Sequence, residues 1–201
     1  MSQKEKNRKG RAILAGGLVL GVGAAVTLAA WNDSEFAQGT FGAGHFNMQG
    51  STNGTVFSDH AAAGAAAQLG FTAGFDNLSP GETVAAPFTL RLDPTTTNDA
   101  AVSVNAASAT GTAANDLTYG IVQLDPAEEC TSTAAGAQAV VPSGTTMDSV
   151  AGASLFTLAK STVDEQPGAD VVLCVQVTAG PAIAQGATAT GSWVFLGTST
   201  P

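Results

Sequence analysis

The chain has 201 residues, with 7 Lys+Arg against 16 Asp+Glu and a formal net charge of −9. This acidity argues against a nucleic-acid-binding protein, because phosphate backbones need a basic surface. A hydrophobic content of 44% argues against a fully disordered chain. Two cysteines are too few for a four-thiolate zinc site or a dense disulfide scaffold. The length predicts one domain, or one domain with a tail.

The charge is unevenly distributed along the chain. Five of the seven basic residues lie in the first eleven positions, and the remainder from residue 31 onward has two basic and fifteen acidic residues, a formal charge of −13. Residues 12–30 form an uncharged apolar run that ends in small side chains. A basic start followed by such a run predicts a secretory signal peptide over residues 1–30. A retained membrane anchor is the alternative, which the Gly- and Ala-rich composition and the minimal length disfavour.

The predicted cleavage junction lies between Ala30 and Trp31. Leu28 stands three residues before this bond, where the usual signal peptidase prefers a small side chain. An aromatic residue followed closely by the acid Asp33 resembles the junction of exported proteins that the SipW-type signal peptidase processes. On this resemblance we expect the mature chain to start at Trp31, with that signal peptidase as a partner during export.

The mature part has the pattern of an all-β protein. Short runs of Val, Thr, Phe and Leu alternate with Gly, Pro, Asn and Asp, and no long helical stripe interrupts them. Asn53–Gly54 predicts a type I′ hairpin turn between apolar pairs. Further strands are predicted over 66–75, 83–92, 100–109, 117–124, 138–141, 155–160, 170–178 and 187–197. Eight to ten strands without helical crossovers predict a jelly-roll-like two-sheet β-sandwich over residues 49–201.

Alternation within two strands predicts which side chains face the core. Phe88, Leu90 and Leu92 share one face of their strand, and Trp193 and Phe195 share a face of the last one. Ala189 and Gly191 belong to that same face.

Cys130 and Cys174 both lie in the exported part of the chain. Because the extracellular environment is oxidising, we predict a disulfide between them. This bond would attach the polar excursion over 126–149 to the sheet. A reactive thiol or a metal-binding cysteine is the alternative, but no histidine stands near either residue in the sequence.

No catalytic constellation is predicted. His45 and His60 are the only histidines, and the sequence has no H-E-x-x-H motif, G-x-S-x-G elbow, Walker loop or dinucleotide fingerprint. Acidic residues could supply calcium ligands, although without EF-hand spacing; a solvated acidic surface is the simpler interpretation. We therefore expect no catalytic residue, no metal and no cofactor. The acidic candidates are Asp93, Asp99, Asp116, Asp125, Glu128, Glu129, Asp164 and Glu165.

Three further segments resemble the TasA–camelysin (CalY) family of biofilm-matrix proteins. They are FAQGTFGAGHFNM from Phe36 to Met48, LSPGETVAAPFTLRL from Leu78 to Leu92, and AIAQGATATGSWVFLG from Ala182 to Gly197, in which Gln185, Gly186, Trp193 and Phe195 carry the motif. Glu82 stands where the family usually has Asp. Residues 98–170 match no pattern of the family.

The resemblance implies a secreted structural protein of the cell surface or biofilm matrix. It implies head-to-tail fibres in which residues 31–48 of one subunit, an N-terminal strand with Trp31, Phe36, Phe41, Phe46 and Met48, complete the sheet of the next. Strand addition of this kind uses main-chain hydrogen bonds for affinity, and a head-to-tail contact that does not close builds a filament. The same segment could instead pair within its own sheet.

Two other functions remain open at this point. Camelysin relatives have been classed as peptidases, so a metal-dependent surface peptidase using His45 and His60 is one alternative. A monomeric adhesin whose acidic loops bind calcium is the other. In each case we expect an extracellular protein with no nucleic-acid partner, no covalent anchor and no membrane attachment after processing.

Overall fold

A computed structural model describes residues 7–14 and 34–200 of the chain. Residues 7–14 are helical and exposed. The predicted cleavage junction at Ala30 and Trp31 lies outside the described residues. Among those that are described, no helix is both long and apolar enough to cross a membrane. The chain divides into a unit that ends at Gly42 and a compact unit that begins at Ala43.

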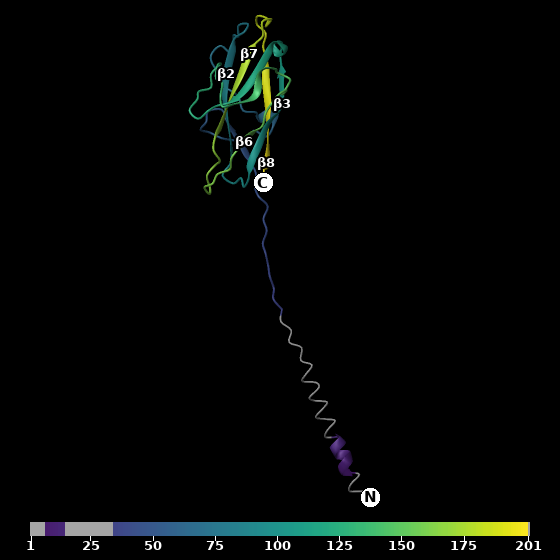
Figure 1. Cartoon of the computed structure of the whole chain (residues 1–201). Helices are drawn as coiled ribbons and strands as arrows, with labels where there is room; N and C mark the ends of the chain where they lie inside the picture. Colours follow the sequence, from purple (N-terminus) through teal and green to yellow (C-terminus); the bar gives the residue numbers. More distant parts are fainter. Residues whose placement is uncertain (1–6, 15–33, 201) are drawn as a thin grey trace. The chain divides into compact units, whose positions relative to one another are not determined.

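The compact unit is an antiparallel two-sheet β-sandwich, which confirms the predicted fold class (Figure 1). A five-stranded sheet has the order β1-β2-β7-β4-β5, and a three-stranded sheet has the order β6-β3-β8. The strands are β1 (Met48–Ser51), β2 (Thr83–Leu92), β3 (Asp99–Thr110), β4 (Leu117–Gln123), β5 (Gln138–Thr146), β6 (Phe156–Leu158), β7 (Val171–Ala179) and β8 (Thr190–Thr200). Two single 3₁₀ turns, η1 (Ala63–Ala65) and η2 (Ala114–Asp116), complete the regular structure.

The core lies between the two sheets and follows the predicted alternation. Phe88 on β2 packs against Phe195 on β8 with ring centroids 5.5 Å apart. Tyr119 on β4 lies 5.7 Å from Trp193 on β8 and is almost completely buried. Its hydroxyl donates a hydrogen bond of 2.7 Å to the carbonyl oxygen of Ser149, and burial raises its pKa to about 12. The aromatic side chains of β8 therefore join two strands of the larger sheet, β2 and β4, to the smaller sheet.

The hairpin predicted around Asn53–Gly54 is reduced to a single bridge between Gly50 and Ser58, and its turn is not of type I′. Gly54 has a positive φ of 70°, whereas Asn53 does not. Instead the Asn53 side-chain oxygen accepts hydrogen bonds from the backbone N–H groups of Thr55 and Val56. Because this side chain holds the turn, the loop is wider, and pairing resumes only at the Gly50–Ser58 bridge.

The strand predicted over 66–75 is not formed. Thr72 makes an isolated contact with β2, in which its N–H donates to the Ala85 carbonyl and its hydroxyl accepts from the Ala85 N–H. Leu69 and Phe71 pack against the main core. The stretch carries its apolar side chains into the core without a strand because glycine and alanine dominate it, and Gly74 has a positive φ of 99°.

Candidate functional site

The predicted disulfide between Cys130 and Cys174 is present. Cys174 is buried on the outward side of β7, where it forms a small second core with Ala85 and Leu124. The Gln176 side chain donates hydrogen bonds of 2.9 Å to the carbonyl oxygens of Thr131 and Ala134. The excursion after β4 is thus attached to the outer face of the five-stranded sheet and covers it.

The N-terminal segment predicted as one strand over 31–48 has two different parts. Residues 34–47 are irregular, and β1 begins only at Met48. Phe36 and Phe41 are 97% and 95% exposed, while Met48 packs against the core of the sandwich. The irregular part that precedes the compact unit, residues 34–42, is called the arm.

Met48 and Phe46 belong to the sandwich because they cover a glycine on β8. An added Cβ at Gly197 would lie 3.3 Å from the Phe46 ring and 3.4 Å from the Met48 sulfur. A glycine at this position lets both side chains pack on β8 without adjustment, whereas a Cβ would press on the Phe46 ring. The predicted assembly residues Phe46 and Met48 thus stabilise their own subunit, whereas Trp31 lies outside the described residues.

Three of the four edge strands have features that discourage pairing with another chain. β1 has four residues, one of which, Gly50, is bridged to Ser58. β6 has three residues, and β5 contains Pro142 and has an irregular register. Short strands, proline and irregularities are the usual protections of a sheet edge. β8 has none of them: it is eleven residues long, contains neither proline nor a charged residue, and has β3 as its only strand neighbour among the described residues.

The strand order of the two sheets shows which strand of a jelly roll would lie beside β8. With strands numbered along the chain, an eight-stranded jelly roll has sheets ordered 2-7-4-5 and 1-8-3-6. The larger sheet here contains β2-β7-β4-β5, and the smaller one is β8-β3-β6. Only β1 departs from the scheme, because it pairs with β2 rather than with β8. The side of β8 away from β3, the β8 edge, has no strand among the described residues where a jelly roll has its first.

Gln185 and Gly186, which the family resemblance singled out, form the turn before β8. Gly186 has a positive φ of 74°, and the Ala187 N–H donates to the Ala184 carbonyl oxygen at 3.1 Å. Trp193 and Phe195 then face the core from β8. Two of these four residues thus form the turn before β8, and the other two form its core-facing side. The exposed backbone along the edge of β8 was not predicted as a site from the sequence.

A cluster of polar side chains fixes the start of β1 to the end of β2. Asp93 accepts hydrogen bonds from the Thr95 and Thr96 hydroxyls and, at 3.3 Å, from the Asn47 side chain. Burial by itself would raise the pKa of Asp93, but these hydrogen bonds together outweigh it and leave the pKa below its ordinary value of 3.8. His45 lies 3.9 Å from the same carboxylate and is largely exposed.

Replacing this carboxylate is expected to destabilise the sandwich. Asp93→Asn should lower the free energy of unfolding by about 1–2 kcal/mol near pH 7, because a neutral amide accepts these hydrogen bonds less strongly. Since the pKa is lower in the folded state, this stabilisation is complete above pH 3.8 and disappears as the pH falls through the folded value. Urea unfolding between pH 7 and pH 2 measures both effects.

The exposed acid Glu129 provides the matched control, because it forms no hydrogen bond among the described residues. Glu129→Gln should leave the unfolding curve unchanged. Equal stability of Asp93→Asn and the unmodified protein at pH 7 would contradict the stabilising role of the cluster.

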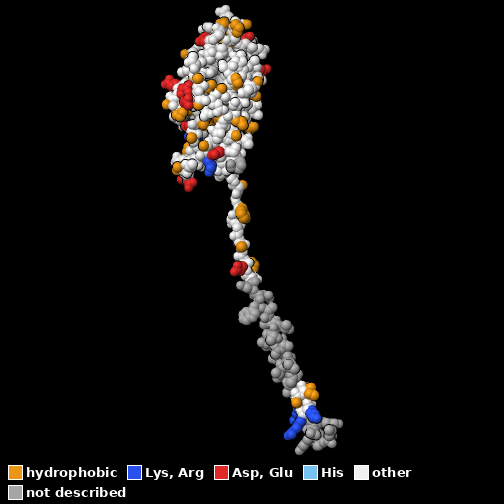
Figure 2. Space-filling model, viewed as in Figure 1, with side chains coloured by type: hydrophobic (Ala, Val, Ile, Leu, Met, Phe, Trp, Pro, Cys, Tyr) orange, Lys and Arg blue, Asp and Glu red, His pale blue; other side chains and the backbone are white. Residues whose placement is uncertain are grey.

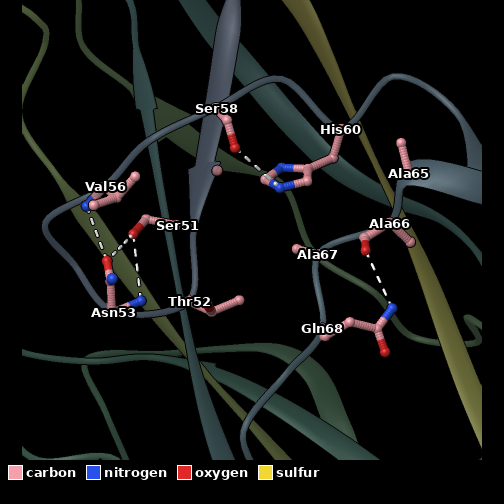
Figure 3. Close-up of a pocket in the computed structure, with 11 residues that line it drawn as sticks. Ser51, Thr52, Asn53, Val56, Ser58, His60, Ala65, Ala66, Ala67 and Gln68 are labelled. Carbon is pink, nitrogen blue, oxygen red and sulfur yellow. Dashed lines mark hydrogen bonds between the residues drawn. The ribbon is translucent and has the colours of Figure 1, made fainter.

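His60 lies in an open hollow of about 390 Å³ beside β1 (Figure 3). Its Nε2 is 3.2 Å from the Ser58 hydroxyl oxygen, and Gln68 and Asn53 also line the hollow. A nucleophilic serine needs a base that a third group orients. Within residues 34–200, no hydrogen bond reaches the other ring nitrogen of His60. The pair therefore resembles a surface hydrogen bond more than a catalytic dyad.

The predicted candidates for metal ligands are dispersed. In the described part of the chain, no three His, Cys, Asp or Glu side chains are grouped to hold a metal ion. The two histidines lie beside different residues: His45 is 3.9 Å from the Asp93 carboxylate, and His60 is within hydrogen-bond distance of Ser58. Glu128 instead accepts hydrogen bonds from the backbone of Asp125 and Gly136, which closes its own loop.

Comparison with known proteins adds no relative. No protein-family model matches the chain, and no curated protein matches it. What the described residues define is a class by structure alone: a disulfide-linked antiparallel β-sandwich with one unprotected edge, preceded by an irregular apolar arm.

Proposed function

We propose that the protein is an exported structural subunit that assembles head to tail into fibres. The arm of one copy adds as a strand to the β8 edge of the next. The observation that carries this proposal is the unprotected β8 edge at the place of the first strand of a jelly roll. An unpaired edge of this length is a template for another chain, and strand addition gives affinity through main-chain hydrogen bonds.

The dimensions and side chains of the arm support this role. Its nine residues span about 30 Å when extended, which is within the length of the eleven-residue β8. By period two, Ala37, Gly39 and Phe41 share one face and Phe36 lies on the other. From Ala37 to Phe41 this face has two small residues and one aromatic, which suits the core side of β8 beside Trp193 and Phe195. Glu35 belongs to the same face and lies at the start of the arm, where it can remain outside the core.

Compartment and charge are consistent with an exported subunit. The disulfide is compatible with an oxidising extracellular environment. The arm carries only one acid, Glu35, and β8 has no charge, so the repulsion expected between strongly acidic subunits is weakest at this contact. Secretion, the SipW-type junction and a place in the biofilm matrix all belong to this proposal.

A synthetic peptide of residues 31–42 tests both the donor and the acceptor. We expect it to shorten fibres of the mature protein in electron micrographs, because it occupies the β8 edge but carries no sandwich that could accept the next arm. Hydrogen exchange of the peptide-bound protein should slow about tenfold or more at the β8 amides and remain unchanged at β5.

A peptide with Phe41→Ser is the matched control and should neither shorten fibres nor protect β8. Protection at β5 instead of β8 would contradict the proposed acceptor. A mature protein that forms no fibres and binds no peptide would contradict strand donation by the arm.

A further inference from the structure

Strand exchange at the β8 edge does not involve the outward face of the three-stranded sheet. Its side chains alternate with those that face the core: Val104 and Phe195 point inward as a pair, and Ser103 and Leu196 point outward as the next. We call the outward-facing residues Ser103, Ala106, Ser192, Val194, Leu196 and Thr198 the open face.

The two outer faces of the sandwich differ in what covers them. On the five-stranded sheet, the disulfide-linked excursion and its small core cover the outer surface. On the three-stranded sheet, neither hydrophobic cluster of the described residues includes an outward-facing residue of β3 or β8. Val194 and Leu196, neighbours on this face, remain 51% and 49% exposed.

The open face is also free of charge on an acidic protein. β6 and β8 contain no charged residue, and β3 contains only Asp99, at its first position. Figure 2 shows uncharged side chains over most of the visible surface of the sandwich, with the acidic ones in separate groups. With a formal charge of −13 from residue 31 onward, two copies repel each other wherever acids meet. On the outward face of the three-stranded sheet the one acid of its strands, Asp99, lies at the end of β3 beside Thr200, so two copies can approach closely over the rest of this face.

We propose that the open face is a second self-association surface, on which two copies pack face to face about a two-fold axis. Small Ser, Thr and Ala side chains make the face flat, and flat sheets stack about 10 Å apart with their apolar side chains interleaved. Val194 and Leu196 supply the apolar contact. This interface uses side chains of β8, whereas strand exchange uses its backbone edge, so the two contacts can coexist.

In a fibre the same face would repeat from subunit to subunit. Weak pairwise contacts then add along two neighbouring fibres, since linked contacts raise the effective concentration of each other. The expected result is lateral bundling. The pairwise contact itself does not depend on the proposed function, which allows the two to be tested separately.

The test uses the mature protein with Phe36→Ser and Phe41→Ser, in which strand exchange is disabled. Sedimentation velocity at increasing protein concentration should show a monomer–dimer equilibrium. Adding Val194→Glu and Leu196→Glu should weaken dimerisation at least about tenfold, because four like charges then meet across the two-fold axis. Val163→Glu is the matched control, since Val163 is 61% exposed in the loop after β6 and is not one of the open-face residues, and it should dimerise like its parent.

Two results would overturn the proposal. One is a parent protein that stays monomeric at every concentration, and the other is equal weakening by Val163→Glu. Co-sedimentation of the monomer with phosphatidylcholine vesicles, abolished by the Val194 and Leu196 changes, would assign the face to a lipid surface instead. If the otherwise unmodified mature protein forms no fibres but the dimer behaves as described, only the proposed function fails.

Discussion

A mature chain that lacks residues 31–42 is expected to remain unassembled under conditions in which the complete mature chain forms fibres. The deletion removes the donor strand and leaves the acceptor edge intact, so each contact loses its main-chain hydrogen bonds and the side chain of Phe41. Because every contact of the fibre is identical, the loss is all-or-none. Electron microscopy and sedimentation of the two chains measure it directly.

The deletion ends at Gly42 because Phe46 and Met48 pack on Gly197 of their own subunit. Removing them would lower the stability of the sandwich and confuse the result. Unfolding of the shortened chain should therefore match that of the complete one. Mixing it with complete subunits supplies a further check, since it still accepts a strand and should terminate growing fibres.

Single substitutions in the arm refine this expectation. Phe41→Ser should reduce assembly far more than Phe36→Ser, because period two directs Phe41 to the core side of β8 and Phe36 to the outer side. Fibres that grow normally from the shortened chain would refute strand donation by the arm. Equal effects of the two serine substitutions would refute only the proposed register.

Removal of the disulfide is expected to have the largest effect on stability. Cys130→Ala with Cys174→Ala should lower the free energy of unfolding by about 4 kcal/mol on the chain-entropy model, because the bond joins residues 44 apart in sequence. The corresponding decrease in melting temperature is roughly 10 °C for a domain of this size. Alanine is chosen because serine at position 174 would leave a hydroxyl buried without an assured partner.

Reduction of the unmodified protein is the internal control and should lower stability by a similar amount. The excursion that the disulfide holds covers the five-stranded sheet, whereas β8 lies in the other sheet. The double variant should therefore still form fibres below its melting temperature. A decrease of less than about 1 kcal/mol would mean that the second core and the Gln176 hydrogen bonds hold the excursion without the bond.

Period-two alternation predicted the strands because half-buried strands must alternate apolar and polar side chains. β2 occupies the predicted range 83–92, and Trp193 and Phe195 face the core as expected. The disulfide was predictable for a different reason: only two cysteines exist, so only one pairing is possible. The first inference depends only on the order of neighbouring residues, and the second depends only on the number of cysteines.

Where side-chain hydrogen bonds or long-range packing compete with local preference, prediction from the sequence was wrong. Asn53 next to glycine indicated a tight I′ turn, but its side chain bonds to Thr55 and Val56 and opens the loop. The strand predicted over 66–75 does not form, and Leu69 and Phe71 pack against the core from an irregular segment. A strand was predicted over 31–48, but residues 34–47 are irregular, and Phe46 and Met48 pack on Gly197 of β8.

The sequence by itself determined that the chain from residue 31 onward is acidic, charged at −13, all-β and able to form one disulfide, because composition, alternation and cysteine count are properties of the chain alone. Only the tertiary structure decided which sheet face has few charged side chains and which sheet edge lacks the features that discourage pairing with another chain. Strand order depends on contacts between residues far apart, and β1 pairs with β2 rather than β8. That single choice of partner leaves β8 with one free edge, and the pleat of the same strand turns Val194 and Leu196 outward on a face without charge.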